Sequence, residues 1–244
     1  MNLTKSINRN SVFFLLLFFI FALWAFWPTY FSNPFREMAV SVHIHGFLMT
    51  VWCLLLIGQA LLIRFNQRSL HRAIGKSSYV LVPLIIISGI SAVHFSVTKL
   101  ADYPPDNYYV EFGHMFNALI VFGILYGLAM RFRKDSSTHA RYMICTIFPA
   151  FTPVFSRIIF NNYDYVMGWL PALNEIPWVQ IIGFALADII LLSLCIIDLK
   201  KRRRWHGFPI AFIIILIYHL GDFVLYRFEW FRSFVDYIMS LPLS

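Results

Sequence analysis

The sequence predicts an all-α fold, a polytopic membrane helical bundle with about seven transmembrane helices. Composition is the first reason: 59% of the 244 residues are hydrophobic and 13% are charged, whereas about 25% of a soluble domain is charged. Apolar runs of about 20 residues, long enough to cross hydrocarbon, recur along the chain and are the second reason. The third is that the segments between these runs are alternately basic and acidic. With a mean hydropathy of +0.69, lipid must be the solvent for most of this surface.

The first apolar run follows Lys5 and Arg9, as in a signal peptide, but it is long and has no small-residue cleavage site. Its end, from Trp24 to Phe31, is an aromatic cluster typical of a membrane interface, so we interpret the run as a retained helix. Pro149 and Pro153 predict a kink in the fifth span. The predicted spans, which together form one helical-bundle domain over 1–244, are 11–31, 38–63, 77–98, 113–131, 142–160, 178–198 and 208–227.

The distribution of charge predicts the orientation. Cytoplasmic loops carry an excess of Lys and Arg, so the basic loops and the N-terminus are expected in the cytoplasm, with residues 228–244 outside. The bacterial cytoplasmic (inner) membrane is the expected location. The basic loops contain Arg64, Arg68, Arg72, Lys76, Arg131, Arg133, Lys134, Arg141, Lys200, Lys201, Arg202, Arg203 and Arg204. The opposite segments contain Glu37, Asp102, Asp106, Glu111, Asp164 and Glu175, with Arg36 and Lys99 as their only basic residues.

The net charge of +8 therefore serves topology and contact with anionic lipid rather than nucleic acid. No basic patch interleaved with exposed aromatic residues lies outside the predicted spans, which argues against a nucleic-acid partner. Cys53, Cys145 and Cys195 each lie inside an apolar run without a CxxC partner. We expect them to be small buried side chains and not a disulfide framework or a zinc site.

Ionisable residues in five predicted spans fall near the outer end of the span. Such residues are costly in lipid and usually face a cavity or one another. We therefore predict one shared, histidine-rich polar pocket in the outer half of the bilayer. Asp188, in the sixth span, is the exception and lies near the midplane. The predicted pocket residues are His43, His45, His94, His114, Arg157, His219 and Asp222.

Helical spacing supports the pocket. His114 and Asn117 share one helix face, and His219 and Asp222 are i, i+3 neighbours with Tyr226 on the same face. A carboxylate beside a histidine is the usual way to orient an imidazole that binds a metal. The third span carries a polar stripe of Ser88, Ser91, His94 and Thr98.

His43 and His45 point about 200° apart on a helix, so one regular helix cannot direct both at one metal. His45 shares its face with Trp52 and Gln59, which favours His45 for the pocket, although the choice between the two stays open. His71, His139 and His206 lie in the basic loops, and we expect them to be solvated or in contact with lipid headgroups.

Several short motifs resemble those of a bacterial family of predicted multi-pass membrane proteins, classed as a domain of unknown function. The motifs are His45-Gly46, Gln59, Leu70-His71-Arg72 with Gly75, and His139-Ala140-Arg141-Tyr142-Met143, and the resemblance covers roughly residues 40–225. It implies a helical inner-membrane protein and brings no established activity. More remotely, paired histidines on neighbouring helices resemble those of membrane b-type cytochromes.

The leading functional hypothesis is redox chemistry or metal handling at heme b, or at copper or another transition metal. A bis-histidine heme needs two imidazoles from different helices at matching depth, and His45, His94, His114 and His219 offer such pairs. Arg157 is expected to bind a heme propionate, because guanidinium pairs with carboxylate. A metal would draw on His43, on these histidines and on Asp222. This hypothesis implies a redox partner.

Two alternatives stay open. A proton-coupled small-molecule transporter would use Asp188, His219 and Asp222 as a proton relay. A membrane assembly factor without catalysis would bind a subunit of a membrane complex and would need no motif. A hydrolase is disfavoured, because the sequence has neither HExxH nor a nucleophile elbow.

Overall fold

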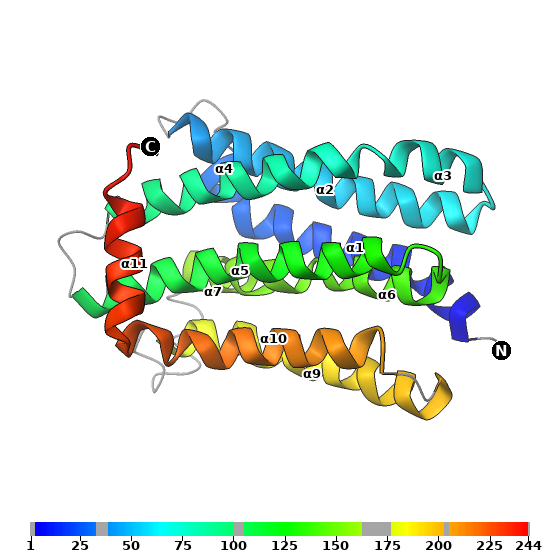
Figure 1. Ribbon diagram of the computed structural model, residues 1–244. Helices are drawn as coiled ribbons and strands as arrows, with labels where there is room; N and C mark the ends of the chain where they lie inside the picture. Colours follow the sequence, from blue (N-terminus) through cyan, green and yellow to red (C-terminus); the bar gives the residue numbers. More distant parts are fainter. Residues whose placement is uncertain (1–2, 33–38, 100–104, 163–176, 203–204, 244) are drawn as a thin grey trace. The chain divides into compact units, whose positions relative to one another are not determined.

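The long apolar runs form α-helices, because backbone in hydrocarbon must satisfy its own hydrogen bonds. The computed structural model describes residues 3–32, 39–99, 105–162, 177–202 and 205–243, and every regular element in these ranges is helical (Figure 1). Within them, seven helical segments are long and apolar enough to cross a membrane, and they overlap all seven predicted spans. This confirms the polytopic all-α fold. The segments are Asn10–Phe31, Val40–Arg64, Arg68–Thr98, Asp106–Arg131, Ser136–Asn161, Gln180–Lys201 and Phe208–Arg227.

The charged segments are described only in part. The basic residues Arg64, Arg72 and Arg133 are exposed, while the orientation of the termini stays a prediction. Cys53, Cys145 and Cys195 are buried and form no disulfide, as expected. Seven residues of the predicted acidic and basic segments lie outside the described residues: Arg36, Glu37, Asp102, Asp164, Glu175, Arg203 and Arg204.

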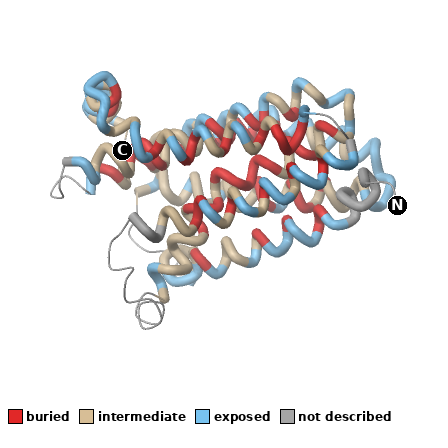
Figure 2. Tube along the Cα trace, turned by 90° about the horizontal axis from the view of Figure 1, so that it is seen from below, coloured by how far each residue is buried: buried red, intermediate tan, exposed pale blue. Residues whose placement is uncertain are grey.

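The helices group into two compact units, which are described separately. The first unit comprises Met1–Arg36 and Leu128–Ile215, and the second comprises Glu37–Gly127 and Leu216–Ser244. Along the long helices of each unit, buried and exposed positions alternate (Figure 2). The prediction of a single domain over 1–244 stays a prediction.

The first unit is built around α7 (Phe151–Asn161), which packs against α1 (Leu3–Phe26) and α9 (Pro177–Arg202). The Phe18 and Phe151 rings stack 5.2 Å apart between α1 and α7. On α9, Gly183 lets the chain approach Thr152 so closely that a Cβ there would stand 3.1 Å from the Thr152 Cα. The unit also contains η1 (Trp27–Phe31), α6 (Ser136–Cys145), η2 (Phe148–Ala150) and the first half of α10 (Phe208–Asp222).

The predicted break in the fifth span is present, and its position has a simple cause. The α-helix ends at Cys145, continues as the 3-10 turn η2 and resumes at Phe151. Pro149 lies in that turn, where its missing N–H and its ring prevent a continuous helix. Pro153 lies in the first turn of α7, where no helical donor is needed.

The second unit contains α2 (Val40–Arg64), which packs against α4 (Ser78–Thr98), and most of α5 (Pro105–Arg131). The basic segment after α2 was expected to be a loop, but most of it is the short helix α3 (Arg68–Gly75). Asn66, at the reversal between α2 and α3, has φ of 59°, a conformation that asparagine tolerates better than most residues.

The last span ends with the 3-10 turn η4 (Leu225–Arg227), and the segment after it folds as α11 (Glu229–Met239), which runs across α4 and α5 rather than along them (Figure 1). Phe231 and Val235 of α11 are buried in an apolar cluster with Val93, Val97 and Phe112. The opposite face of α11 exposes large aromatic side chains, Trp230 and Tyr237 among them. The helix is thus amphipathic, and it covers the end of the second unit.

Candidate functional site

The second unit holds a buried centre formed by α5 and α10. The Nδ1–H of His114 donates to the Asp222 carboxylate at 2.8 Å, and the two side chains are 7% and 5% exposed. Asn117 Nδ2 donates to the other carboxylate oxygen at 3.0 Å. The Tyr218 hydroxyl donates to the His114 backbone carbonyl at 3.3 Å and lies 3.4 Å from Nδ1. These four residues are called the His114–Asp222 centre below.

Helical periodicity explains how the centre assembles. His114 and Asn117 are three residues apart on α5, and they contact the two oxygens of one carboxylate, which agrees with the shared face predicted from sequence. Tyr218 and Asp222 are four residues apart on α10, so their side chains also point the same way. The pairing itself differs from the expectation, because the sequence placed Asp222 beside His219. His219 is buried and packs its ring against Tyr218, with the centroids 5.0 Å apart.

His45 contacts α4 rather than the His114–Asp222 centre. Its Nδ1 lies 3.2 Å from Ser88 Oγ, and because Ser88 donates its own proton to the Ile85 carbonyl, the imidazole N–H is the donor. Gly89 makes room for this contact: a Cβ at Gly89 would stand 3.1 Å from His45 Cε1 and 2.6 Å from Leu119 Cδ2. The structure thus directs His45 into the helix interface. His43 is half-buried on the same helix.

His94 lies under the covering helix α11. Its Nε2–H donates to the Met239 backbone carbonyl at 3.2 Å, and the imidazole is buried. Of the other members of its polar stripe, Ser88 bonds to His45, whereas Thr98 is exposed and bonds to the Phe95 carbonyl. The stripe is therefore divided between separate contacts.

Two predicted site residues belong to the first unit. Arg157 Nη1 donates to the Pro153 carbonyl at 3.0 Å, and its guanidinium lies 4.6 Å from the centre of the Phe26 ring. Asp188 is half-buried on α9. The proposed roles of Arg157 toward a heme propionate and of Asp188 in a proton relay stay predictions.

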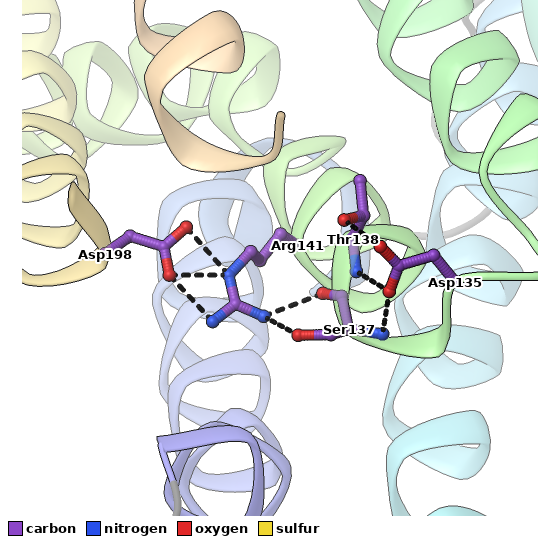
Figure 3. A network of polar contacts seen from close by, with 5 residues as sticks. All are labelled: Asp135, Ser137, Thr138, Arg141 and Asp198. Carbon is purple, nitrogen blue, oxygen red and sulfur yellow. Dashed lines mark hydrogen bonds and ion pairs between the residues drawn. The ribbon is translucent and has the colours of Figure 1, made fainter. Parts of the chain in front are cut away.

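A buried ion pair in the first unit was missed from sequence. Arg141 was assigned to a cytoplasmic loop, but its side chain is 0% exposed and it binds Asp198, which is 1% exposed, with Nη2–Oδ1 at 2.8 Å (Figure 3). Arg141 Nε lies 2.9 Å from both carboxylate oxygens, and Nη1 donates to Ser137. The Arg141 guanidinium also lies 5.5 Å from the centre of the Phe208 ring.

A signal for this pair was present in the sequence. Asp135 caps α6 by accepting from the backbone N–H groups of Ser137 and Thr138, and Asp followed by Ser and Thr is a helix start signal. A helix starting at Ser136 places Arg141 in its second turn rather than in a loop. Asp198, at the end of an apolar run, was the available counter-ion.

The loop histidines have varied surroundings. His139 Nδ1–H donates to the Ala129 carbonyl at 2.8 Å, so this residue is more ordered than a solvated loop side chain. His206 is exposed and packs against Phe132 at 4.6 Å. His71 is half-buried on α3.

Within the described residues, no group of three or more His, Cys, Asp or Glu side chains is placed to hold a metal ion. The predicted metal site therefore has no ligand cluster in this part of the chain to support it. Comparison with known proteins found no matching family model, curated protein or solved structure. The family resemblance noted in the sequence therefore stays a prediction. What the structure supports is a helical multi-pass membrane protein with a buried histidine–carboxylate centre.

Proposed function

We propose that the protein moves protons across the cytoplasmic membrane, in proton-coupled transport, with the His114–Asp222 centre as its protonation site. The observation that carries this proposal is the buried 2.8 Å contact between His114 and Asp222 inside membrane-spanning helices. Ionisable residues within the membrane are costly and typically mark ion pathways and proton relays. The sequence hypothesis already assigned Asp222 to such a relay.

The chemistry of the pair suits this role. Histidine is the side chain that gains and loses a proton near neutral pH. When the imidazole carries a proton on both nitrogens, its positive charge cancels the negative charge of the carboxylate, and the pair is then compatible with apolar surroundings. Gain or loss of a proton changes that charge by one, and this difference can be coupled to opening toward one side. Asn117 and Tyr218 hold the two groups in place. Asp188 and His219 remain the proposed further members of the relay.

Proton flux into liposomes tests the proposal. Full-length protein is reconstituted with a trapped pH-sensitive dye, and flux is driven by a potassium diffusion potential. Asp222→Asn and His114→Gln should lower the flux roughly a hundredfold, the low end of what a positioned acid–base group contributes. Asp236→Asn is the matched control, because Asp236 is an exposed carboxylate on α11 that accepts from Tyr109. A flux that Asp222→Asn leaves unchanged would overturn the proposal, and Asp188→Asn tests the extended relay.

A heme b or transition-metal site, copper included, is the second candidate. His45 and His114 both bond to the protein through Nδ1, to Ser88 and Asp222 respectively. That arrangement is typical of histidines oriented to bind a metal through Nε2. The test is the visible spectrum and metal content of the purified protein. A Soret band lost in His114→Ala would favour this candidate, whereas a colourless, metal-free protein with proton flux would reject it.

A further inference from the structure

A second group of buried polar residues lies in the second unit, around Gln59 on α2. Gln59 is 9% exposed, and neither its amide oxygen nor its amide nitrogen has a hydrogen-bond partner among the described residues. Trp52, on the same helix, is 1% exposed, and its indole Nε1 likewise has no partner in the described part of the chain. Buried polar atoms in proteins are nearly always hydrogen-bonded.

Contacts join these residues to two hydroxyl groups. The Trp52 and Tyr126 rings pack edge to face, with centroids 5.9 Å apart. The Tyr126 hydroxyl lies 2.9 Å from Ser78 Oγ, and because Ser78 donates to the Gly75 carbonyl at 2.6 Å, Tyr126 is the donor in that contact. Gln59 Oε1 lies 3.5 Å from the point where a Cβ on Gly75 would stand. The amide, the indole and both hydroxyls therefore line one region.

This region is separate from the His114–Asp222 centre. Tyr126 and His114 both lie on α5, twelve residues apart, a rise of about 18 Å along the helix. Large apolar side chains, including Ile85, Phe122 and Leu125, are buried within the same unit. Gln59 lies near the end of α2, and the neighbouring Lys76 and Ser77 are exposed. The region therefore lies near the end of the second unit that carries α3.

The chemistry of the site selects its ligand. Its side chains are all uncharged, and together they offer both donors and acceptors, so a fitting ligand is small, neutral and able to donate and accept. Water has these properties, and a buried water typically makes about three hydrogen bonds to groups that would otherwise be unsatisfied. The missing side chain of Gly75 leaves space beside the Gln59 carbonyl oxygen.

We propose that Gln59, Trp52, Ser78 and Tyr126 form a hydrated site that binds ordered water molecules. Its role in proton access, from the end of the unit away from the His114–Asp222 centre, rests on the proposed function. The hydration itself does not depend on that function.

Hydroxyl-radical footprinting tests the site directly. The full-length reconstituted protein is irradiated with X-rays in ¹⁸O water, and oxidised residues are identified by mass spectrometry. Bound water is the radical source, so Trp52 and Tyr126 should be labelled although they are buried, about tenfold above Phe112, a buried ring in an apolar cluster. Gln59→Leu and Gly75→Ala should each lower the labelling of Trp52 and Tyr126 several-fold. Equal labelling in the wild type and Gln59→Leu would overturn the proposal.

Further variants and measurements cover the cases in which Gln59→Leu does not fold, the amide is dry, or the proposed function fails. If Gln59→Leu does not fold, Trp52→Phe keeps an aromatic ring on α2 but removes the indole N–H, and it should lower the labelling of Tyr126. If the amide were dry, Gln59→Leu would raise the unfolding temperature by removing an unpaired polar group, and that rise would count against hydration. Asp222→Asn should lower proton flux as stated above and leave the labelling of Trp52 intact. If the wild-type protein shows labelling of Trp52 and Tyr126 but no proton flux, the proposed function is rejected and the hydrated site is retained.

Discussion

Both units bury a contact between a carboxylate and a basic side chain, and the two contacts differ in the basic group. In the first unit, Asp198 binds the Arg141 guanidinium through two nitrogens, and both side chains are essentially inaccessible. In the second unit, Asp222 binds the His114 imidazole through one nitrogen, and Asn117 occupies its other oxygen. Arginine keeps its proton under all ordinary conditions, whereas histidine can lose it.

The difference separates a structural contact from a reactive one. In the Arg141–Asp198 pair the guanidinium keeps its charge, and the contact holds α6 against α9 within the first unit. An imidazole, unlike a guanidinium, is a general acid–base group, and this is the chemistry that the proposed function requires of the His114–Asp222 pair. For this reason we place the function in the second unit.

The largest expected effect on stability comes from breaking the Arg141–Asp198 pair. Asp198→Leu leaves Arg141 charged and buried without its counter-ion, and it should lower the free energy of unfolding by about 3–5 kcal/mol. Unfolding of the purified protein in mixed micelles measures this loss. The double variant Asp198→Leu with Arg141→Met should recover most of the stability. Equal instability of the single and double variants would show that the pair does not act as a unit.

The corresponding change in the second unit should be less damaging to stability. Asp222→Leu leaves a histidine that can become neutral, so the expected loss is about 1–3 kcal/mol, the cost of unsatisfied hydrogen bonds. The same unfolding assay compares it directly with Asp198→Leu. A loss as large as that of Asp198→Leu would mean that His114 stays charged, and it would remove the distinction drawn between the two pairs.

A change in the packing beside His45 should have a smaller effect on the free energy of unfolding. Gly89→Ala places a Cβ 2.6 Å from Leu119 Cδ2 and 3.1 Å from His45 Cε1, so Leu119 must move, at a cost of about 1–3 kcal/mol. Gly58→Ala is the control, because a Cβ there meets nothing within 4 Å, and it should be neutral or stabilising by about 0.5–1 kcal/mol. Adding Leu119→Ala to Gly89→Ala should relieve the clash. Identical unfolding free energies for the two glycine variants would argue against tight packing at His45.

The smallest effect is expected at an exposed pair in the second unit. Arg232 Nη2 lies 2.6 Å from Asp106 Oδ1, but the side chains are 35% and 62% exposed. Water screens such pairs, so Arg232→Gln should cost about 0–1 kcal/mol, and high salt should reduce the difference further. A loss near that of Asp198→Leu would mean that α11 depends on this ion pair rather than on the burial of Phe231 and Val235.

The sequence predicted the location of the polar groups better than their partners. The shared face of His114 and Asn117 is confirmed, because it depends only on helical spacing within α5. Asp222 was paired with His219, its neighbour on the same helix, yet its carboxylate binds His114 on another helix. The assignment of Arg141 to a loop was wrong, because the helix start signal at Asp135 was not used. The helix α11 was missed because its apolar stripe is short.

By itself, the sequence determined an all-α fold with seven spans and the proline break in the fifth span. In lipid, each span must be apolar and must satisfy its own backbone hydrogen bonds. The pattern that identifies a span therefore lies within about 20 consecutive residues. Only the tertiary structure decided that Asp222 meets His114, that Asp198 meets Arg141 and that Gln59 is left without a partner among the described residues. These contacts depend on the rotation and depth of one helix relative to another, and small residues such as Gly89 set those variables through packing.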